Sequence, residues 1–428
     1  MTDDVARAAR FNRECDCVSA DVPALQQRLD GALGGAGLAQ SIVHSHPHLF
    51  SDTPVFVARQ HAQAMQRLIS AVEAVVALPA YREEVLARAP AIARSAPRTR
   101  SVFFGFDFHI AAGLPQLIEI NTNAGGALLN IEMRREQQAC CEPAASYLNV
   151  AASAQSLEAA VFGMFMHEWN LARGAQPLRT VAIVDDAPAG QYLFPEFLLV
   201  QKLFAARGLQ ALIIDARELT IEADALTWRG QRIDLVYNRS TDFYFTQHAA
   251  LAEACTRDLA VITPHPHAHA LYSNKHNLVT LSDPGSLRAM HADPADIETL
   301  LASIPRTRLV TGSDESWWAE RKQWFFKPVS GFGSRGTYRG DKITRRAFGD
   351  VMRGDYIAQT IAPPGERRRG NSPGSEPFKL DIRSYAYDGV QQLLAARLYR
   401  GQTTNFRSAG GGFAPVYLLE EGLEERAR

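Results

Sequence analysis

The chain has 428 residues, of which 46% are hydrophobic and 21% charged, a composition typical of globular proteins and not of disordered or fibrous ones. Its 45 basic and 46 acidic residues give a formal net charge of −1, which excludes the overall positive charge typical of nucleic-acid-binding proteins. No run of about 18 uncharged apolar residues predicts a membrane span. The charged N-terminus lacks the apolar region of a secretory signal, and five cysteines favour a reducing, cytoplasmic location.

Residues 1–150 are expected to mix helices with one pair of strands. A long helix is predicted to begin at Thr53-Pro54, where a capping residue precedes a proline at the first helical position. A further helix is expected over Tyr81–Ala93. Two apolar runs then follow, Ser101–Ile110 and Gln116–Thr122, with a glycine-containing turn between them. This pattern predicts a β-hairpin.

Residues 151–270 are expected to form a separate α/β unit, because predicted strands alternate with predicted helices and so favour a mostly parallel sheet. Its strands are predicted at 179–184, 210–214, 226–230 and 232–238, and its helices at 154–170 and 195–206. Residues 271–428 change character and are richer in strands. These are predicted at 324–329, 337–339, 356–361, 378–387 and 392–399, with a polar loop over 365–376.

The predicted hairpin carries a cluster of oxygen-bearing side chains. If the turn centres on Gly113, Asp107 lies opposite Glu119, and Asn121 shares the face of Glu119. Opposed residues of antiparallel strands lie about 5 Å apart, so two carboxylates and an amide oxygen would converge. Such a set suits Mg²⁺, which is usually shared with substrate phosphates. The alternative is a solvent-facing Asp107 with Glu119 in a salt bridge.

A glycine-rich segment follows the predicted strand that contains Lys327. Gly331, Gly333 and Gly336 fit the pattern G-x-G-x-x-G of dinucleotide-binding proteins, but that fingerprint opens a helix, whereas a strand and turn are expected after Gly336. A loop between two strands can instead offer backbone N–H groups to phosphates, with Lys327 adding a charge. The alternative is an ordinary glycine-rich turn beside an exposed lysine.

The C-terminal strands carry a third set of polar residues. Lys379, Asp381 and Arg383 alternate along one strand and therefore share a face, and arginines there can hold carboxylate or phosphate oxygens in bidentate fashion. Arg397, Arg400, Asn405 and Arg407 follow, with the glycines Gly410, Gly411 and Gly412. The alternative is a solvated charged face and a loop.

Two H-x-H-x-H runs, at 44–48 and 265–269, are interrupted by prolines. We expect them to be loop residues or, for the second run, part of the wall of a nucleotide site. Zinc ligation is disfavoured, since zinc sites usually draw ligands from separated segments.

Together these motifs resemble the ATP-grasp superfamily. Their order, with the acidic E-x-N segment before both lysines, resembles the circularly permuted branch that includes eukaryotic-type glutathione synthetase and the synthetase domain of glutathionylspermidine synthetase. The resemblance implies an α/β (α+β) ATP-grasp fold with a Rossmann-like substrate domain. Residues 1–150 would supply a helical segment and the metal-ligand hairpin, 151–270 the substrate domain, and 271–428 the nucleotide-binding subdomains.

The resemblance also implies a role for each candidate residue, with ATP and Mg²⁺ as cofactors. Asp107, Glu119 and Asn121 would hold the metal. Nucleotide-binding residues would be Lys275, Lys327, Ser330, Gly331, Phe332, Gly333 and Ser334, with Ile357, Ala358 and Gln359 in the hinge that reads adenine. Arg383, Arg397 and Arg400 would be catalytic, and Asn238, Arg239, Ser240, Asn405, Gly410, Gly411 and Gly412 would bind substrate. There are two departures. Just after the second lysine, where some relatives have a metal-binding acid, this chain has Val329, Ser330 and Gly331. The hinge carries Gln359 in place of an acid.

The resemblance implies an ATP-dependent carboxylate–amine ligase, which phosphorylates a carboxylate and lets an amine attack the acyl phosphate. Its expected partners are a small-molecule or peptide carboxylate and an amine, with neither nucleic acid nor membrane, and a homodimer is left open. One alternative is a nucleotide-binding protein of this fold without turnover. Another is an NAD-dependent oxidoreductase that uses the glycine-rich loop, with Asp355 near the spacing of a ribose-binding acid.

Overall fold

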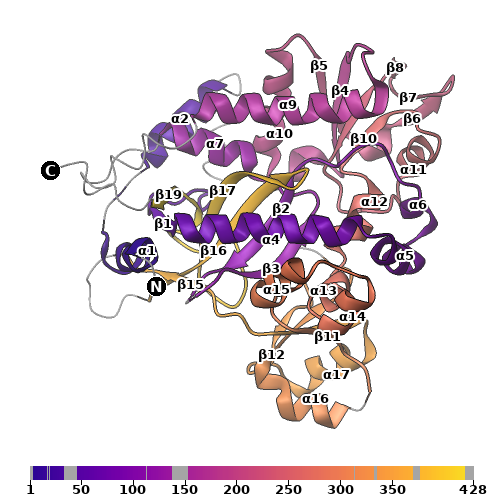
Figure 1. Ribbon diagram of the computed structural model, residues 1–428. Helices are drawn as coiled ribbons and strands as arrows, with labels where there is room; N and C mark the ends of the chain where they lie inside the picture. The colour runs from indigo at the N-terminus through magenta and orange to yellow at the C-terminus, as the bar shows by residue number, and fades with distance from the viewer. Residues whose placement is uncertain are drawn as a thin grey trace.

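A six-stranded antiparallel sheet joins early and late parts of the sequence in the computed structural model (Figure 1). The model describes residues 3–16, 18, 20–32, 46–111, 113–136, 153–312, 314–331, 335–369 and 376–419. The strand order of this central sheet is β18-β17-β16-β2-β3, with β15 also beside β16. Its strands are β2 (Phe104–His109), β3 (Gln116–Asn121), β15 (Gly365–Arg367), β16 (Phe378–Tyr387), β17 (Val390–Tyr399) and β18 (Gly412–Ala414).

The predicted hairpin is confirmed as β2 and β3, and Asp107 lies opposite Glu119. The register is not uniform, because Phe108 pairs with Leu117 and leaves Ile118 as an extra residue on β3. This irregularity is a β-bulge, in which the extra residue has no partner in the ladder. The bulge therefore brings Glu119, and not Ile118, opposite Asp107.

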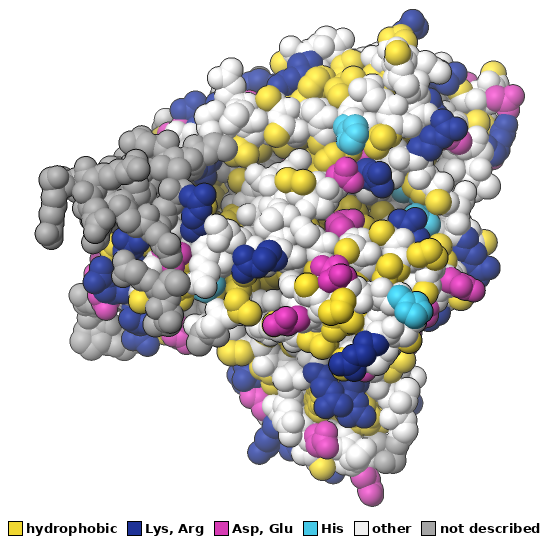
Figure 2. Space-filling model, viewed as in Figure 1, with side chains coloured by type: hydrophobic (Ala, Val, Ile, Leu, Met, Phe, Trp, Pro, Cys, Tyr) yellow, Lys and Arg dark blue, Asp and Glu magenta, His cyan; other side chains and the backbone are white. Residues whose placement is uncertain are grey.

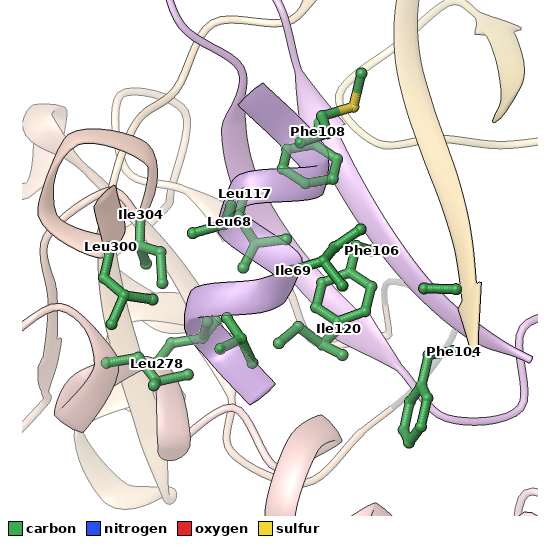
Figure 3. Close-up of a cluster of buried hydrophobic side chains, with 14 of the residues drawn as sticks. Leu68, Ile69, Phe104, Phe106, Phe108, Leu117, Ile120, Leu278, Leu300 and Ile304 are labelled. Atoms are coloured by element: carbon green, nitrogen blue, oxygen red, sulfur yellow. The ribbon is translucent and has the colours of Figure 1, made fainter. Parts of the chain in front are cut away.

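The central sheet has one apolar face, which packs against α4 (Arg59–Ala77). Alternation along the strands sends Phe104, Phe106 and Phe108 to this face, where they belong to one buried cluster with Leu68 and Ile69; all five are drawn in Figure 3. Further apolar side chains come from α13 (Asn277–Leu281) and α15 (Pro294–Ser303). The opposite face carries the polar residues of the same strands, including Asp107 and Arg383, which are directly paired across β2 and β16.

The helix predicted to begin at Thr53-Pro54 begins later, at Arg59. The intervening residues form β1 (Val55–Ala58), which pairs in parallel with β19 (Val416–Leu419). All four residues of β1 are buried, so tertiary strand pairing outweighs the local capping signal. The helix expected over Tyr81–Ala93 is divided into α5 (Pro79–Arg88) and α6 (Ala91–Arg94), because Pro90 cannot continue a helix interior.

The remaining N-terminal helices are α1 (Asp3–Glu14), α2 (Val22–Ala32) and α7 (Ala127–Arg135).

A second sheet, drawn in the upper part of Figure 1, is wholly parallel, with the strand order β10-β9-β4-β5. The parallel arrangement agrees with the alternation of strands and helices in the sequence. Its strands are β4 (Thr180–Asp185), β5 (Gln210–Asp215), β9 (Leu235–Asn238) and β10 (Val261–Thr263), and its neighbouring helices are α9 (Ala154–Arg173), α10 (Phe194–Ala205) and α11 (Ala249–Thr256). A small antiparallel sheet beside it contains β6 (Thr220–Glu222), β7 (Ala225–Trp228) and β8 (Gln231–Arg232).

A lobe at the bottom of Figure 1 contains an antiparallel sheet of order β11-β14-β12-β13. Its elements are β11 (Thr307–Leu309), α16 (Asp314–Glu320), β12 (Trp324–Pro328), β13 (Tyr338–Arg339), α17 (Arg345–Arg353) and β14 (Tyr356–Thr360). Trp317, Phe326 and Phe348 form its separate core. Figure 2 shows Lys and Arg side chains gathered on the visible face of this lobe.

Short helical segments complete the described chain. They are η1 (Pro188–Gly190), η2 (Ala216–Glu218), α12 (Pro266–Ala268), η3 (His269–Ser273), α14 (Pro284–Ala289) and η4 (Arg321–Gln323). Among the helices that the structure describes, none has the length and apolarity needed to cross a bilayer.

Candidate active site

A cavity of about 340 Å³ lies where the polar face of the central sheet meets the sheet of the lobe. Strands β2, β3, β16 and β17 of the central sheet supply one wall, and β12 and β14 of the lobe supply the other. The candidate residues that line it are Asp107, Glu119, Asn121, Lys275, Lys327, Gly331, Gln359, Arg383 and Arg397. Residues separated by hundreds of positions in the sequence thus meet in one place.

Two buried lysines enter this cavity from different elements. Lys275, shortly after η3, has its Nζ 3.0 Å from Glu119 Oε1 and 2.8 Å from the carbonyl oxygen of Gly331. Lys327, on β12, donates hydrogen bonds of 2.7 Å to the carbonyl of Ile118 and to Oε1 of Gln359. Burial lowers the pKa of Lys327 to about 8, although the negative charge of Glu119 opposes this shift.

Asp107 is already paired with two arginines. Arg383 contacts both of its oxygens, at 2.6 and 2.7 Å, and Nη2 of Arg397 lies 2.9 Å from Oδ2. Burial would raise the pKa of Asp107, but the two guanidinium groups hold it down at about 2. Two adjacent positive charges also repel a metal ion. Of the three expected metal ligands, Asp107 is therefore engaged by arginines, and the three-ligand set stays a prediction.

The two cavity-lining arginines are held by carboxylates at fixed positions. Arg397 Nε lies 2.7 Å from Asp381 Oδ1, and Thr404 donates a hydrogen bond to the other oxygen of Asp381. Arg400, expected beside them, lies elsewhere. It is exposed, and its guanidinium stacks 4.3 Å from the ring centre of Phe378.

The residues expected in the hinge are divided between a strand and the cavity lining. Ile357 and Ala358 lie in β14, which pairs on one edge with β11 and on the other with β12. Their backbone groups are committed to these ladders, so they are not free to read an adenine ring. The segment that reaches the cavity begins at Gln359 and continues through Thr360 to Ala362.

The glycine-rich loop is described only in part. Gly331 lines the cavity, Ser330 is exposed and is not among the lining residues, and Phe332, Gly333 and Ser334 lie outside the described residues. The segment after Gly336 forms β13, which pairs with β12. A dinucleotide fingerprint opens a helix at this point, so this structural context differs from that of a nicotinamide-binding protein.

The first group of expected substrate residues lies at the end of β9, outside the cavity lining. Arg239 is buried, and its Nη1 donates a 2.6 Å hydrogen bond to the carbonyl of Asn123. Its Nε is buried without a hydrogen-bond partner among the described residues. Ser240 contacts Asp186 at 3.0 Å, and the amide of Asn238 lies 3.4 Å from the carbonyl of Pro264.

The second group of expected substrate residues stabilises a loop and lies outside the cavity lining. The side-chain amide of Asn405 donates a 2.8 Å hydrogen bond to the carbonyl of Arg400. The carbonyl of Gly410 accepts a bond from Ser51. A Cβ atom on Gly411 or Gly412 would lie 2.5 Å from the backbone oxygen of Leu398 or His48, respectively. These glycines therefore allow close packing of chain segments in the described structure.

Several lining residues were not identified from the sequence, among them His109, Arg335, Tyr399, Thr403, Thr404 and Phe406. A signal existed for His109, because it stands two positions after Asp107 on a strand and so shares its face. The other lining residues lie in turns, or on strands whose partners are distant in the sequence, and no local motif marks them.

Those histidines of the two runs that the structure describes do not form a cluster. His44 lies outside the described residues. In the second run, His265 contacts Cys255 Sγ, His267 contacts the carbonyl of Ala93, and His269 contacts Thr122. Within the described ranges, no group of three or more His, Cys, Asp or Glu is arranged to hold a metal ion.

Comparison with known proteins rests on structure alone, since no family model and no curated protein sequence matches the chain. A glutathione synthetase-like effector from Globodera pallida, in its apo form, matches with a TM-score of 0.53 and 11% identity, over 94% of this chain and 99% of that one. The fold is glutathione synthetase-like. At this identity the likeness concerns the fold and not the activity.

Two further structural matches are too weak to support a conclusion by themselves. A γ-glutamylcysteine synthetase described as putative, from Methylobacillus flagellatus, has a TM-score of 0.45 and 12% identity, over 81% of this chain and 83% of that one. D-alanyl-alanine synthetase A from Vibrio cholerae has a TM-score of 0.31 and 12% identity, over 59% and 77% of the two chains. The mixed α/β, glutathione synthetase-like fold thus rests on the first match.

Proposed function

We propose that this protein is an ATP-dependent carboxylate–amine ligase with a circularly permuted ATP-grasp arrangement. The observation that carries the proposal is the convergence of Lys275, Lys327 and Glu119 in one cavity between two sheets. Two cations and an oxygen ligand in an enclosed site suit the triphosphate of a nucleotide. The glutathione synthetase-like fold supports this assignment.

The strand order supports the permuted arrangement. The hairpin of β2 and β3 precedes both lysines in sequence, yet β2 pairs with β16 near the other end of the chain. In this proposal residues 1–150 contribute the metal-ligand hairpin, 151–270 the substrate domain and 271–428 the nucleotide-binding subdomains. The parallel sheet formed by β4, β5, β9 and β10 would then be the Rossmann-like part of the molecule.

Glu119 and Asn121 fit a magnesium ion, because each can present an oxygen and they share one face of β3. Glu119 would exchange its present partner, Lys275, for the metal. When bound, the metal supplies charge neutralisation to the phosphates. The two lysines add to that neutralisation, since Nζ of Lys275 is freed to reach a phosphate oxygen and Lys327 approaches from β12.

Arg383 and Arg397 would hold the substrate carboxylate and stabilise the negative charge that develops during its phosphorylation. Asp107 and Asp381 keep their guanidinium groups in place before substrate arrives, so little reorganisation is needed.

The test separates nucleotide binding from turnover. Thermal unfolding is followed with MgATP and with ATP plus chelator, because a ligand at about 100 times its Kd stabilises by about 2.7 kcal/mol. A panel of carboxylates is then incubated with MgATP and hydroxylamine, which converts an acyl phosphate to a hydroxamate whatever the natural amine. The matched variants are Glu119→Gln and, on the exposed surface of α15, Glu298→Gln.

Hydroxamate that forms with the native protein and with Glu298→Gln, but not with Glu119→Gln, would support the ligase. A magnesium-dependent shift without hydroxamate or ADP from any carboxylate would favour nucleotide binding without turnover. Stabilisation by NADH alone would contradict both and restore the oxidoreductase alternative.

A further inference from the structure

The cavity lining combines charged and apolar side chains, and His109 adds a polar atom to it. The charged side chains include the two lysines, Glu119 and the two arginines. Apolar lining comes from Ile118 on β3, Phe325 on β12, and Ile361 and Ala362 after β14. A flat heteroaromatic ring would find apolar contact between these strands, while an attached triphosphate would extend toward the lysines.

The tautomer of His109 follows from its neighbour. Nδ1 of His109 lies 2.7 Å from the carbonyl oxygen of Ala362. A carbonyl oxygen can only accept, so Nδ1 carries the hydrogen. In the neutral ring Nε2 then has a lone pair and acts as an acceptor. Burial favours the neutral ring, since it lowers the pKa of His109 below its usual value, although the hydrogen bond to Ala362 and the charge of Asp381 oppose this shift.

The side-chain amide of Gln359, which also lines the cavity, is not free to perform the same task. Gln359 accepts a 2.7 Å hydrogen bond from Lys327 through Oε1, and its Nε2 lies 3.3 Å from Oγ1 of Thr307. Both ends of its amide group are thus engaged, and its orientation is fixed. His109 therefore supplies an oriented acceptor in a region where the ring of a nucleotide would lie.

We propose that Nε2 of His109 selects a purine with an amino group at C6 over a purine with an oxygen at C6. Adenine presents an N–H donor at this position and can satisfy Nε2. Hypoxanthine and guanine present an acceptor there, which would leave two lone pairs facing each other in a buried site. Loss or mismatch of one such buried pairing reduces affinity strongly. The inference rests on the proposed function, since it assumes that a nucleotide occupies this cavity.

Calorimetric binding of MgATP, MgITP and the magnesium complex of purine riboside triphosphate tests this inference. ITP differs from ATP in its oxygen at C6, and purine riboside triphosphate has no substituent there. For the native protein we expect ATP to bind at least about tenfold more tightly than either analogue, as one well-formed hydrogen bond predicts. This comparison uses only the native protein, so it does not depend on whether a variant folds.

The variant His109→Phe keeps a ring of similar size and removes the acceptor. We expect its ATP affinity to fall to that of ITP, so that the ratio of the two approaches one. The control Phe325→Leu trims the apolar lining and should weaken both nucleotides alike, leaving the ratio unchanged.

The outcomes separate the two proposals. In the first outcome, MgATP binds to the native protein and Glu119→Gln abolishes this binding, while the ratio of ATP to ITP affinity is the same in the native protein and in His109→Phe. This outcome would overturn the role of His109 and leave the proposed function standing. Equal binding of all three nucleotides to the native protein would overturn it as well. Failure of every nucleotide to bind would overturn both.

Discussion

The ammonium group of Lys327 donates a 2.7 Å hydrogen bond to the carbonyl oxygen of Ile118, the extra residue of the bulge in β3. An extra residue in a bulge has no ladder partner, so its carbonyl remains available to a side chain. The bulge thus has two effects on the candidate site. It places Glu119 opposite Asp107, and it provides an acceptor that positions a buried lysine.

The pKa of Lys327 predicts how nucleotide binding depends on pH. Because this pKa is about 8, the side chain is charged below pH 8 and loses its proton as the pH rises. Anionic phosphates favour the charged form and raise the pKa on binding. We expect MgATP affinity to fall above pH 8, and binding just above that pH to take up as much as one proton per site.

Calorimetry in two buffers of different ionisation enthalpy measures that uptake. Lys327→Met removes the titrating group and should abolish the uptake, whereas Lys322→Met, on the exposed surface, should leave it unchanged. Release of protons by the native protein would contradict the prediction.

Asp107 is expected to matter for stability even without nucleotide. Asp107→Asn would leave two buried guanidinium groups without their shared counter-charge, and breaking such a pair costs about 3–5 kcal/mol. Urea unfolding of the free protein measures the loss. The control is Asp341→Asn, which breaks a partly exposed pair with Arg339 and should cost less than about 1 kcal/mol. Equal stability of the two variants would show that Asp107 is not an anchor.

The packing of α4 on the central sheet predicts a large effect of one truncation. Leu68 is fully buried among Phe106, Phe108 and their neighbours. Leu68→Ala should lower the free energy of unfolding by about 2–5 kcal/mol, through lost burial and the cavity left behind. Leu301→Ala, at a side chain that is 37% exposed, should cost less than about 1 kcal/mol. A small loss at Leu68 would mean that the face of α4 is not packed as described.

Gly126 and Gly163 should respond oppositely to the same substitution. Gly126 has φ +99°, and a Cβ atom there would lie 2.2 Å from Phe413 Cζ. We expect Gly126→Ala to destabilise the protein by more than about 1 kcal/mol. Gly163, inside α9, has nothing within 4 Å of such an atom, so Gly163→Ala should stabilise by up to about 1 kcal/mol. Denaturation midpoints compare the two, and a stabilising Gly126→Ala would contradict the tight approach to Phe413.

Local patterns predicted the hairpin and its facing acids, because alternation and turn residues act over short distances. They also predicted β4, β5 and β9 of the parallel sheet. The strand β10 was not predicted, and the strand predicted at 226–230 lies in the small antiparallel sheet as β7. The predicted start of α4 was wrong, because the residues after Thr53 pair with a strand near the other end of the chain. A capping signal holds no information on such a distant partner.

The partner of Asp107 was missed for the same reason. The carboxylate was matched with a metal because Glu119 and Asn121 stand nearby in sequence. Its contact with Arg383 spans 276 positions, and only the register of β2 on β16 brings the two together. Likewise, a strand was predicted at 356–361, but its own segment does not indicate that it pairs on both edges.

The pairing of β2 with β16 also has a consequence for the order of assembly. A ribosome makes a chain from its N-terminus, and domains generally fold as they emerge. The hairpin with Asp107 is therefore made long before the strand that carries Arg383. Until then β2 has an open hydrogen-bonding edge, which favours association with other chains. We expect nascent chains that end before β16 to require a chaperone and to lack nucleotide binding.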